Sequence, residues 1–240
     1  MEFNEWLEEW LEYKIKPSTK VRTYEKYRTG ISRYITPALG GYALEELNTM
    51  KLQKFAVSLS DGGLAPSTVN CLISILKHSL RSAVAYGVTE RQYSDGLTRP
   101  KQAEKQIECF TKEEQKILEE YIFTHEKYNL YGILIALYTG VRIGELLALT
   151  WQDFDFDKML LSVNKSCYDK WEEGAYSKII ETPKTRSSSR LIPIPVQLSG
   201  LLIELKEMCS SRYAVSGRSE HGAEIRSYQR IFACFCQNSD

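Results

Sequence analysis

The sequence has little histidine and none of the closely paired cysteines that commonly bind metal. Its 240 residues include three histidines, which stand apart from one another, and six cysteines, none of which forms a C-x-x-C pair. Structural zinc sites need such ligands at short spacing. We therefore expect no metal site, and we expect free thiols, several of them buried, as is usual in a reducing compartment.

Long hydrophobic runs are also missing. No stretch approaches the roughly 18 consecutive apolar residues that a membrane-spanning helix requires. The acidic N-terminal stretch MEFNEWLEEWLEYK lacks the apolar core of a signal peptide. With 43% hydrophobic and 26% charged residues, the composition is that of an ordinary soluble protein. These features predict a cytoplasmic protein of one or two domains with no membrane partner.

There is no net charge of either sign, but the charges are unevenly distributed along the chain. Between Lys14 and Pro100 there are 13 lysines and arginines against six acidic residues, whereas residues 1–13 hold five glutamates and no base. Residues 101–160 hold seven bases against 11 acids. Such asymmetry is typical of a basic module that binds a polyanion, although a lysine-rich solvated surface would give the same counts.

Apolar residues at helical spacing predict a four-helix bundle in the first part of the chain. Pro17, with Ser18 and Thr19 after it, marks the expected start of the second helix. The helices that we expect cover residues 2–15, 17–34, 48–62 and 66–87. The basic residues around the second and fourth helices that we single out as contacts for a polyanion are Lys20, Arg22, Lys26, Arg28, Lys77 and Arg81.

The rest of the chain predicts a linker and a second domain. Residues 93–109 have no apolar periodicity and are rich in turn-formers and charge, which favours a linker between a domain over 1–92 and another over 110–240. Thr111 and Glu114 have the spacing of a capping box. The expected elements are helices over 112–125 and 128–138, a short helix with Arg142 in its first turn, two strands within 151–163, two more within 177–195, and helices over 196–209 and 225–237. The predicted fold class is thus mainly α, a helical bundle followed by an α+β domain with a small antiparallel sheet.

The stretch TGVRIGELLAL contains an arginine and a glutamate in an otherwise apolar run. Burying a guanidinium is costly unless an anion meets it. Arg142 near a helix start can hold a phosphate in a two-pronged fork, assisted by backbone N–H groups. Glu145, three residues on, is placed to orient the guanidinium. The alternative is a purely structural ion pair between the two.

Lys184 lies in a polar turn between the last two expected strands, after Pro183 and before a run of serines. A lysine at a hairpin tip can reach outward and donate to a phosphate, or act as a general acid on a leaving oxygen. The alternative is an ordinary solvated lysine in a turn.

Several segments resemble the tyrosine recombinases, the phage-integrase family. LYTGVRIGELLALTWQDFDF resembles the first arginine box of that family, and TPKTRSSSRLIPIP resembles the β-hairpin that carries its catalytic lysine. The N-terminal helices, from EWLEEWLEYK to SLRSAVAYGV, resemble the family's core-binding domain, a SAM-like helical bundle. The resemblance covers residues 3–236, and the arginine box is its most specific part.

The resemblance implies a chemistry for these residues. Tyrosine recombinases attack a DNA phosphodiester with a tyrosine hydroxyl and form a 3′-phosphotyrosyl link, without metal or cofactor. By resemblance, Arg142 stabilises the crowded phosphate, Glu145 is its structural partner, and Lys184 protonates the 5′-oxygen. Double-stranded DNA is then the partner, and Arg186 joins the basic residues above as a DNA contact. The family recombines mobile DNA as tetramers, whereas we expect this chain to be mostly monomeric off DNA.

The sequence departs from the family pattern near its end. The family's His-x-x-Arg box, its Gly-His pair and its nucleophilic tyrosine do not occur among the 240 residues. Tyr228 precedes the place where that box belongs, and we interpret it as a packing residue. We therefore expect a catalytic domain truncated at its C-terminus, which binds DNA without cutting it. The alternatives are a DNA-binding regulator or decoy of a full-length integrase, and a helical protein-interaction module with a small sheet.

We predict that the chain forms no covalent adduct with nicked duplex DNA, because it lacks the family's tyrosine in its normal context. The measurement is denaturing gel electrophoresis after incubation with a labelled nicked duplex. A protein–DNA band that survives detergent would overturn the prediction.

Overall fold

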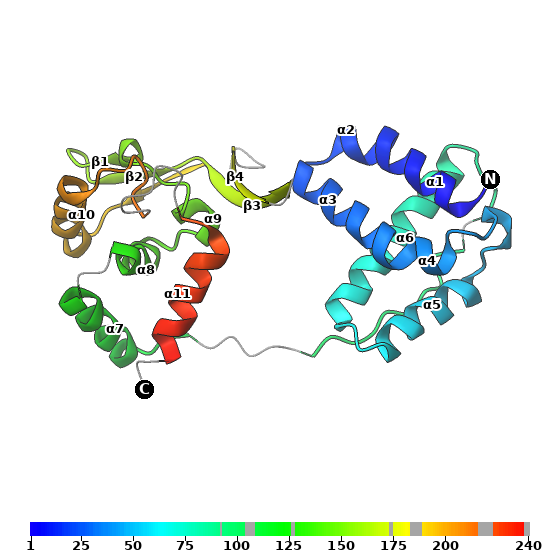
Figure 1. Ribbon diagram of the computed structural model, residues 1–240, viewed down its shortest axis with the longest axis horizontal. Helices are drawn as coiled ribbons and strands as arrows, with labels where there is room; N and C mark the ends of the chain where they lie inside the picture. Colours follow the sequence, from blue (N-terminus) through cyan, green and yellow to red (C-terminus); the bar gives the residue numbers. More distant parts are fainter. Residues whose placement is uncertain are drawn as a thin grey trace. The chain divides into compact units, whose positions relative to one another are not determined.

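The computed structural model describes residues 1–91, 93–103, 109–125, 128–172, 175–182, 189–215 and 223–237. The chain divides into two compact units, Met1–Ile107 and Glu108–Asp240 (Figure 1). Helices make up most of both units, and small antiparallel sheets occur in the second, so the predicted fold class is confirmed. Each unit has its own buried apolar core.

The first unit is helical. Its longest helices, α5 and α6, and its N-terminal helix α1 fall where apolar periodicity placed them. In chain order the elements are α1 (Phe3–Trp10), a π-helical turn (Leu11–Ile15), α2 (Lys16–Ser18), α3 (Val21–Gly30), a second π-helical turn (Ile31–Ile35), α4 (Thr36–Leu39), a 3₁₀ turn (Leu44–Glu46), α5 (Thr49–Asp61) and α6 (Pro66–Ala85).

Both π-helical turns come just before a proline, and they correct one prediction. Pro17 does not start the second helix: it lies in the last turn of the first helical segment, and α3 begins at Val21 after Lys20. Proline has no N–H to bond the carbonyl four residues back, and its ring clashes with that carbonyl in a regular helix. The N–H of Lys16 instead bonds the carbonyl of Leu11, five residues back, which widens the turn. The same turn precedes Pro37, so helical structure continues to Leu39.

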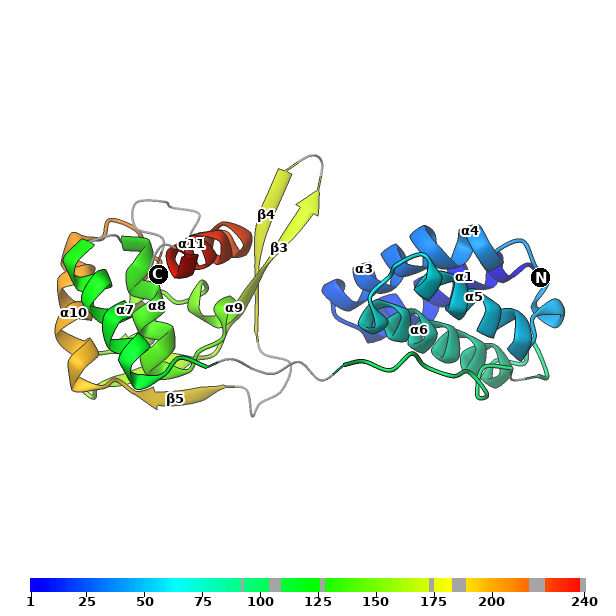
Figure 2. The same cartoon turned by 90° about the horizontal axis from the view of Figure 1, so that it is seen from below.

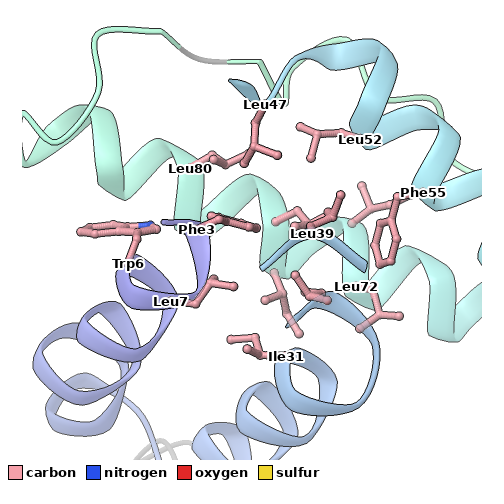
Figure 3. Close-up of a cluster of buried hydrophobic side chains, with 14 of the residues drawn as sticks. Phe3, Trp6, Leu7, Ile31, Leu39, Leu47, Leu52, Phe55, Leu72 and Leu80 are labelled. Carbon is pink, nitrogen blue, oxygen red and sulfur yellow. The ribbon is translucent and has the colours of Figure 1, made fainter. Parts of the chain in front are cut away.

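The core of the first unit joins α1, α4, α5 and α6 (Figure 3). Phe3 and Leu7 of α1 are fully buried in it, together with Leu52 of α5. Helix α3 packs on α6 through Gly30, where an added Cβ would lie 3.1 Å from both Leu72 and Ile75. Helices α3 and α6 therefore lie against each other at Gly30.

Residues 93–100, expected to be linker, pack on the first unit. Thr49 of α5 donates its hydroxyl to the carbonyl of Tyr93 at 2.8 Å, and Asn70 of α6 donates its amide to the carbonyl of Pro100 at 3.2 Å. Leu97 is buried in the first core. The domain boundary therefore lies later than the sequence predicts. One buried leucine, and hydrogen bonds from side chains of the first unit to backbone carbonyls, anchor a segment that shows no apolar periodicity.

The second unit mixes helices and strands. The capping box is confirmed: Thr111 N–H bonds the Glu114 carboxylate at 2.7 Å, and Glu114 N–H bonds the Thr111 hydroxyl at 3.2 Å. Helix α8 contacts α7, α10 and α11. In chain order the elements are α7 (Lys112–His125), α8 (Tyr128–Thr139), α9 (Ile143–Leu146), a 3₁₀ turn (Trp151–Asp153), β1 (Phe154–Asp155), β2 (Leu160–Val163), β3 (Ser166–Glu172), β4 (Ala175–Glu181), β5 (Arg190–Pro193), α10 (Val196–Met208) and α11 (Ile225–Gln237).

The two strands expected within 177–195 pair differently from the prediction. Strand β5 adds to β2 in a sheet of order β1-β2-β5, whereas β4 pairs with β3 in a separate two-stranded hairpin (Figure 2). The strands on either side of the Lys184 segment therefore do not pair with each other, and the expected hairpin between them is wrong. Strand β3, which the sequence analysis did not assign, supplies the partner of β4, with Tyr168 opposite Ile179.

Helix α11 packs on α8 through a close contact between Tyr228 and Gly132. Tyr228 is buried, which agrees with a packing role, and burial raises the pKa of its phenol. A Cβ added at Gly132 would collide with the Tyr228 hydroxyl and would lie 2.6 Å from Val215. Any larger residue at this position would force Tyr228 and Val215 to shift.

We predict that Gly132→Ala lowers the free energy of unfolding by about 1–3 kcal/mol, the usual cost of overpacking a core. Gly200 of α10 is the matched control, because a Cβ there meets nothing within 4 Å. Gly200→Ala should stabilise by about 0.5–1 kcal/mol through helix propensity. Urea denaturation of both variants makes the comparison; equal effects would contradict the role of the α8–α11 contact.

Candidate functional site

Arg142 and Glu145 occupy the start of the short helix α9. Gly140 ends α8 with a φ of +65°, which reverses the chain direction. Arg142 is the residue just before α9, in extended conformation, and not in its first turn as expected. Its N–H donates to Glu145 Oε2 at 2.9 Å, and its guanidinium Nη1 donates to Oε1 at 3.0 Å. The predicted pairing of the two residues is therefore present.

Arg190, at the start of β5, is a third member of this cluster. Its Nη2 donates to Glu145 Oε2 at 2.8 Å and its Nη1 donates to Oε1 at 3.2 Å, a bidentate contact. The sequence analysis missed Arg190. It lies 45 residues beyond Glu145, and no local spacing connects the two. Only the tertiary fold of the second unit brings the two side chains together.

The cluster carries one net positive charge, and that charge is exposed at Arg142. Glu145 is 7% exposed, whereas the Arg142 side chain is 77% exposed. Burial alone would raise the pKa of Glu145. Hydrogen bonds from Arg190, and from the backbone and side chain of Arg142, outweigh it and lower the pKa to about 2. The carboxylate therefore stays ionised beneath two guanidinium groups, and Arg142 remains accessible to an external anion.

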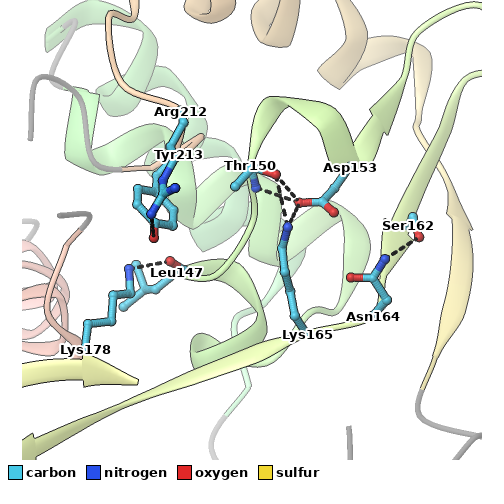
Figure 4. A network of polar contacts seen from close by, with 9 residues as sticks. All are labelled: Leu147, Thr150, Asp153, Ser162, Asn164, Lys165, Lys178, Arg212 and Tyr213. Atoms are coloured by element: carbon cyan, nitrogen blue, oxygen red, sulfur yellow. Dashed lines mark hydrogen bonds and ion pairs between the residues drawn. The ribbon is translucent and has the colours of Figure 1, made fainter. Parts of the chain in front are cut away.

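The β3–β4 hairpin holds α9 in place (Figure 4). Lys178 of β4 donates its ammonium to the carbonyl of Leu147, at the C-terminal end of α9, at 2.6 Å. That ammonium also lies 4.5 Å from the centre of the Tyr213 ring, and burial lowers its pKa. On the opposite strand, the hairpin approaches Gly144 so closely that an added Cβ would lie 2.7 Å from the Ser166 hydroxyl.

Lys165 is committed to a structural network beside the site (Figure 4). Its ammonium lies 2.6 Å from Asp153 Oδ2 and donates to the Thr150 hydroxyl at 3.0 Å. Asp153 also accepts from the N–H of Thr150 at 2.7 Å. This lysine, just before β3, therefore links the connection between β2 and β3 to the 3₁₀ turn. Lys184 and Arg186 lie outside the described residues, so their roles remain predictions.

The basic residues singled out in the first unit lie on two contacting helices. Lys20, Arg22, Lys26 and Arg28 lie at the start of or along α3, and Lys77 and Arg81 lie on α6. Arg28 pairs with Glu25 at 2.7 Å, and Arg81 pairs with Asp95 at 2.8 Å. Exposed pairs of this kind contribute little, so both arginines can exchange these partners for phosphates. Their role as DNA contacts remains a prediction.

The described residues contain neither a metal-binding cluster nor a membrane-spanning helix. Within these parts of the chain, no group of three or more histidine, cysteine, aspartate or glutamate side chains is placed to hold a metal ion. Across the same described ranges, none of the helices combines the length and apolar character needed to cross a membrane.

Residues 2–60 match the family model described as the N-terminal SAM-like domain of phage integrases. A tyrosine recombinase XerC-like protein of Caldanaerobacter subterraneus subsp. tengcongensis is 31% identical over 207 residues, which cover 81% of this chain. The chain belongs to the tyrosine recombinase, or phage integrase, family. The ICEBs1 integrase of Bacillus subtilis is a further similar protein, 26% identical over 92% of this chain. This chain spans 52% and 62% of the lengths of those two relatives.

Solved structures of integrases share the fold. The Tn1549 transposon integrase, in complex with transposon right end DNA, matches with a TM-score of 0.85 at 18% identity, over 100% of this chain and 79% of that one. A lambda integrase dimer bound to a COC′ core site matches with a TM-score of 0.74 at 17% identity, over 100% of this chain and 64% of that one. Both units of this chain therefore have counterparts in the integrase fold.

We predict that the contribution of Glu145 to the stability of the second unit depends on pH. The pKa falls from 4.5 to about 2 on folding. Pairing of the carboxylate therefore stabilises the fold above pH 4.5, by on the order of 3 kcal/mol. That stabilisation is lost as the pH falls toward 2.

Glu145→Gln should accordingly destabilise at pH 7 and have a much smaller effect near pH 2–3, in urea denaturation across that range. Glu204→Gln, on the exposed side of α10, is the matched control and should change little at any pH. A loss of stability that is independent of pH would contradict the ion-pair argument.

Proposed function

We propose that this chain is the DNA-binding and phosphate-activating part of a site-specific tyrosine recombinase that acts on mobile DNA. The observation that carries the proposal is the Arg142–Glu145–Arg190 cluster, which presents an exposed guanidinium above a buried carboxylate. The similar integrases of Tn1549 and lambda were solved in complex with DNA, which supports double-stranded DNA as the partner here.

The proposed roles follow from charge and reach. Arg142 binds the scissile phosphate and stabilises the negative charge that gathers on it when an oxygen attacks. The Glu145 carboxylate orients Arg142 through hydrogen bonds to its backbone and side chain. Lys184 protonates the 5′-oxygen as it leaves. The family's tyrosine and His-x-x-Arg box are not among these 240 residues, so the step that we assign to this chain alone is DNA binding without cleavage.

The first unit supplies the remaining contacts with the duplex. The basic side chains of α3 and α6 meet backbone phosphates, which position a protein on DNA without reading its sequence. No metal or cofactor takes part in this proposal. A lambda integrase tetramer bound to a Holliday junction has the same fold, and we infer tetramers on DNA for the complete recombinase, a monomer for this chain off DNA, and a cytoplasmic location.

We predict that binding to duplex DNA weakens steeply with salt. If six to ten phosphates are contacted, affinity should fall by about 10³–10⁵ between 50 and 200 mM salt. Arg142→Gln should lower affinity about tenfold and reduce the slope of log affinity against log salt by about one, because one phosphate contact is lost.

Lys158→Gln is the matched control for Arg142→Gln. Lys158 lies between β1 and β2, its side chain is 74% exposed, and it pairs with Asp155 of β1. Its replacement removes the same charge from the same unit. It should leave the slope unchanged if the effect of Arg142 is local. Fluorescence anisotropy with a labelled duplex measures all three proteins. A flat salt response of the wild-type chain would overturn the proposed function.

A further inference from the structure

The carboxylate of Glu145 receives more hydrogen bonds than orientation of Arg142 requires. Oε1 accepts from Arg142 Nη1 at 3.0 Å and from Arg190 Nη1 at 3.2 Å. Oε2 accepts from the Arg142 N–H at 2.9 Å and from Arg190 Nη2 at 2.8 Å. One buried carboxylate thus has two guanidinium partners, and their geometries differ.

Of the two arginines, Arg190 makes the more constrained contact with Glu145. It contacts both carboxylate oxygens, its side chain is 31% exposed, and its backbone is fixed in the sheet opposite Val163 of β2. A bidentate fork on a carboxylate is a strong and directional contact. Arg142 makes a single side-chain bond, and its side chain is 77% exposed. Of the two arginines, Arg142 is the one free to turn toward an external anion.

Arg190 provides Glu145 with a counter-charge that does not depend on Arg142. If Arg142 were the sole partner, its move to a phosphate would leave a buried carboxylate without a counter-charge, which is strongly unfavourable. The unpaired carboxylate would also repel the incoming phosphate. With Arg190 in place, Glu145 stays neutralised when Arg142 leaves it.

We propose that Arg190 is a positioning residue which holds the charge of Glu145 and so releases Arg142 to bind a DNA phosphate. The proposal rests on the proposed function of Arg142. It assigns the two arginines different tasks: Arg190 keeps the carboxylate paired, and Arg142 contacts the DNA. Without Arg190, Glu145 captures the Arg142 guanidinium.

The first test measures capture directly and needs no DNA. In the wild-type chain, NMR of the arginine side chains should show rapid rotation of the Arg142 guanidinium about its Cζ–Nε bond. In Arg190→Gln, that rotation should slow several-fold, because Arg142 becomes the only cation on Glu145. Unchanged rotation in this variant would overturn the proposal, whatever the DNA measurements show.

The second test uses a labelled mixed-sequence 30-base-pair duplex at fixed low salt. Arg190→Gln should weaken binding about tenfold, as Arg142→Gln does, since a charge-assisted contact of Arg142 is lost in both. The double variant Glu145→Gln/Arg190→Gln lacks the carboxylate that would hold Arg142. Its affinity for DNA should return to within about threefold of wild type. Arg190→Lys, which keeps the charge, should bind nearly as wild type does.

The outcomes separate the two claims. If Arg142→Gln does not weaken binding but Arg142 rotation slows in Arg190→Gln, the phosphate role of Arg142 fails and the positioning role of Arg190 stands. If the double variant binds as weakly as Arg190→Gln, Arg190 serves only to join β5 to α9 or contacts DNA itself, and the proposal is overturned. Thermal melting of each variant verifies folding, and Arg190→Lys carries the test if Arg190→Gln does not fold.

Discussion

A buried carboxylate between two guanidinium groups is the interaction on which the second unit depends. Glu145 joins the start of α9 to the start of β5 through Arg190, and it also accepts the backbone N–H of Arg142. The same group therefore caps a helix, links a helix to a sheet and fixes where a positive charge reaches the surface. Because the helix is only four residues long, it has little stability of its own and relies on these contacts.

The β3–β4 hairpin stabilises the C-terminal end of α9. Lys178 bonds the carbonyl at the C-terminal end of the helix, and Gly144 lets the β3–β4 hairpin approach its backbone. Held at both ends, α9 fixes the backbone position of Arg142, and the exposed side chain can then turn toward a ligand. Such preorganisation is what stabilisation of a charged phosphate requires.

The first unit is stabilised by its apolar core and, among its described residues, not by a buried ion pair. Its stability comes from an apolar core, in which α1, α5 and α6 contribute fully buried side chains, and its charges lie outside that core. The basic residues of α3 and α6 can therefore be arranged for a polyanion without disturbing the fold. The wide turns before Pro17 and Pro37 show how the backbone accommodates prolines within helical segments. Family membership accounts for both units, since the matching integrase structures contain counterparts of each.

The sequence by itself determined the features that local chemistry controls. Apolar periodicity placed α7 and α8, the capping spacing of Thr111 and Glu114 placed a helix start, and the arginine box indicated both the family and the Arg142–Glu145 pair. The tertiary structure alone decided three others. Strand β4 pairs with β3 and not β5, residues 93–100 pack on the first unit, and Arg190 shares the carboxylate of Glu145. The reason is distance along the chain: caps and i, i+3 pairs are fixed by spacing, whereas strand partners and remote ion pairs depend on which surfaces meet when the core forms.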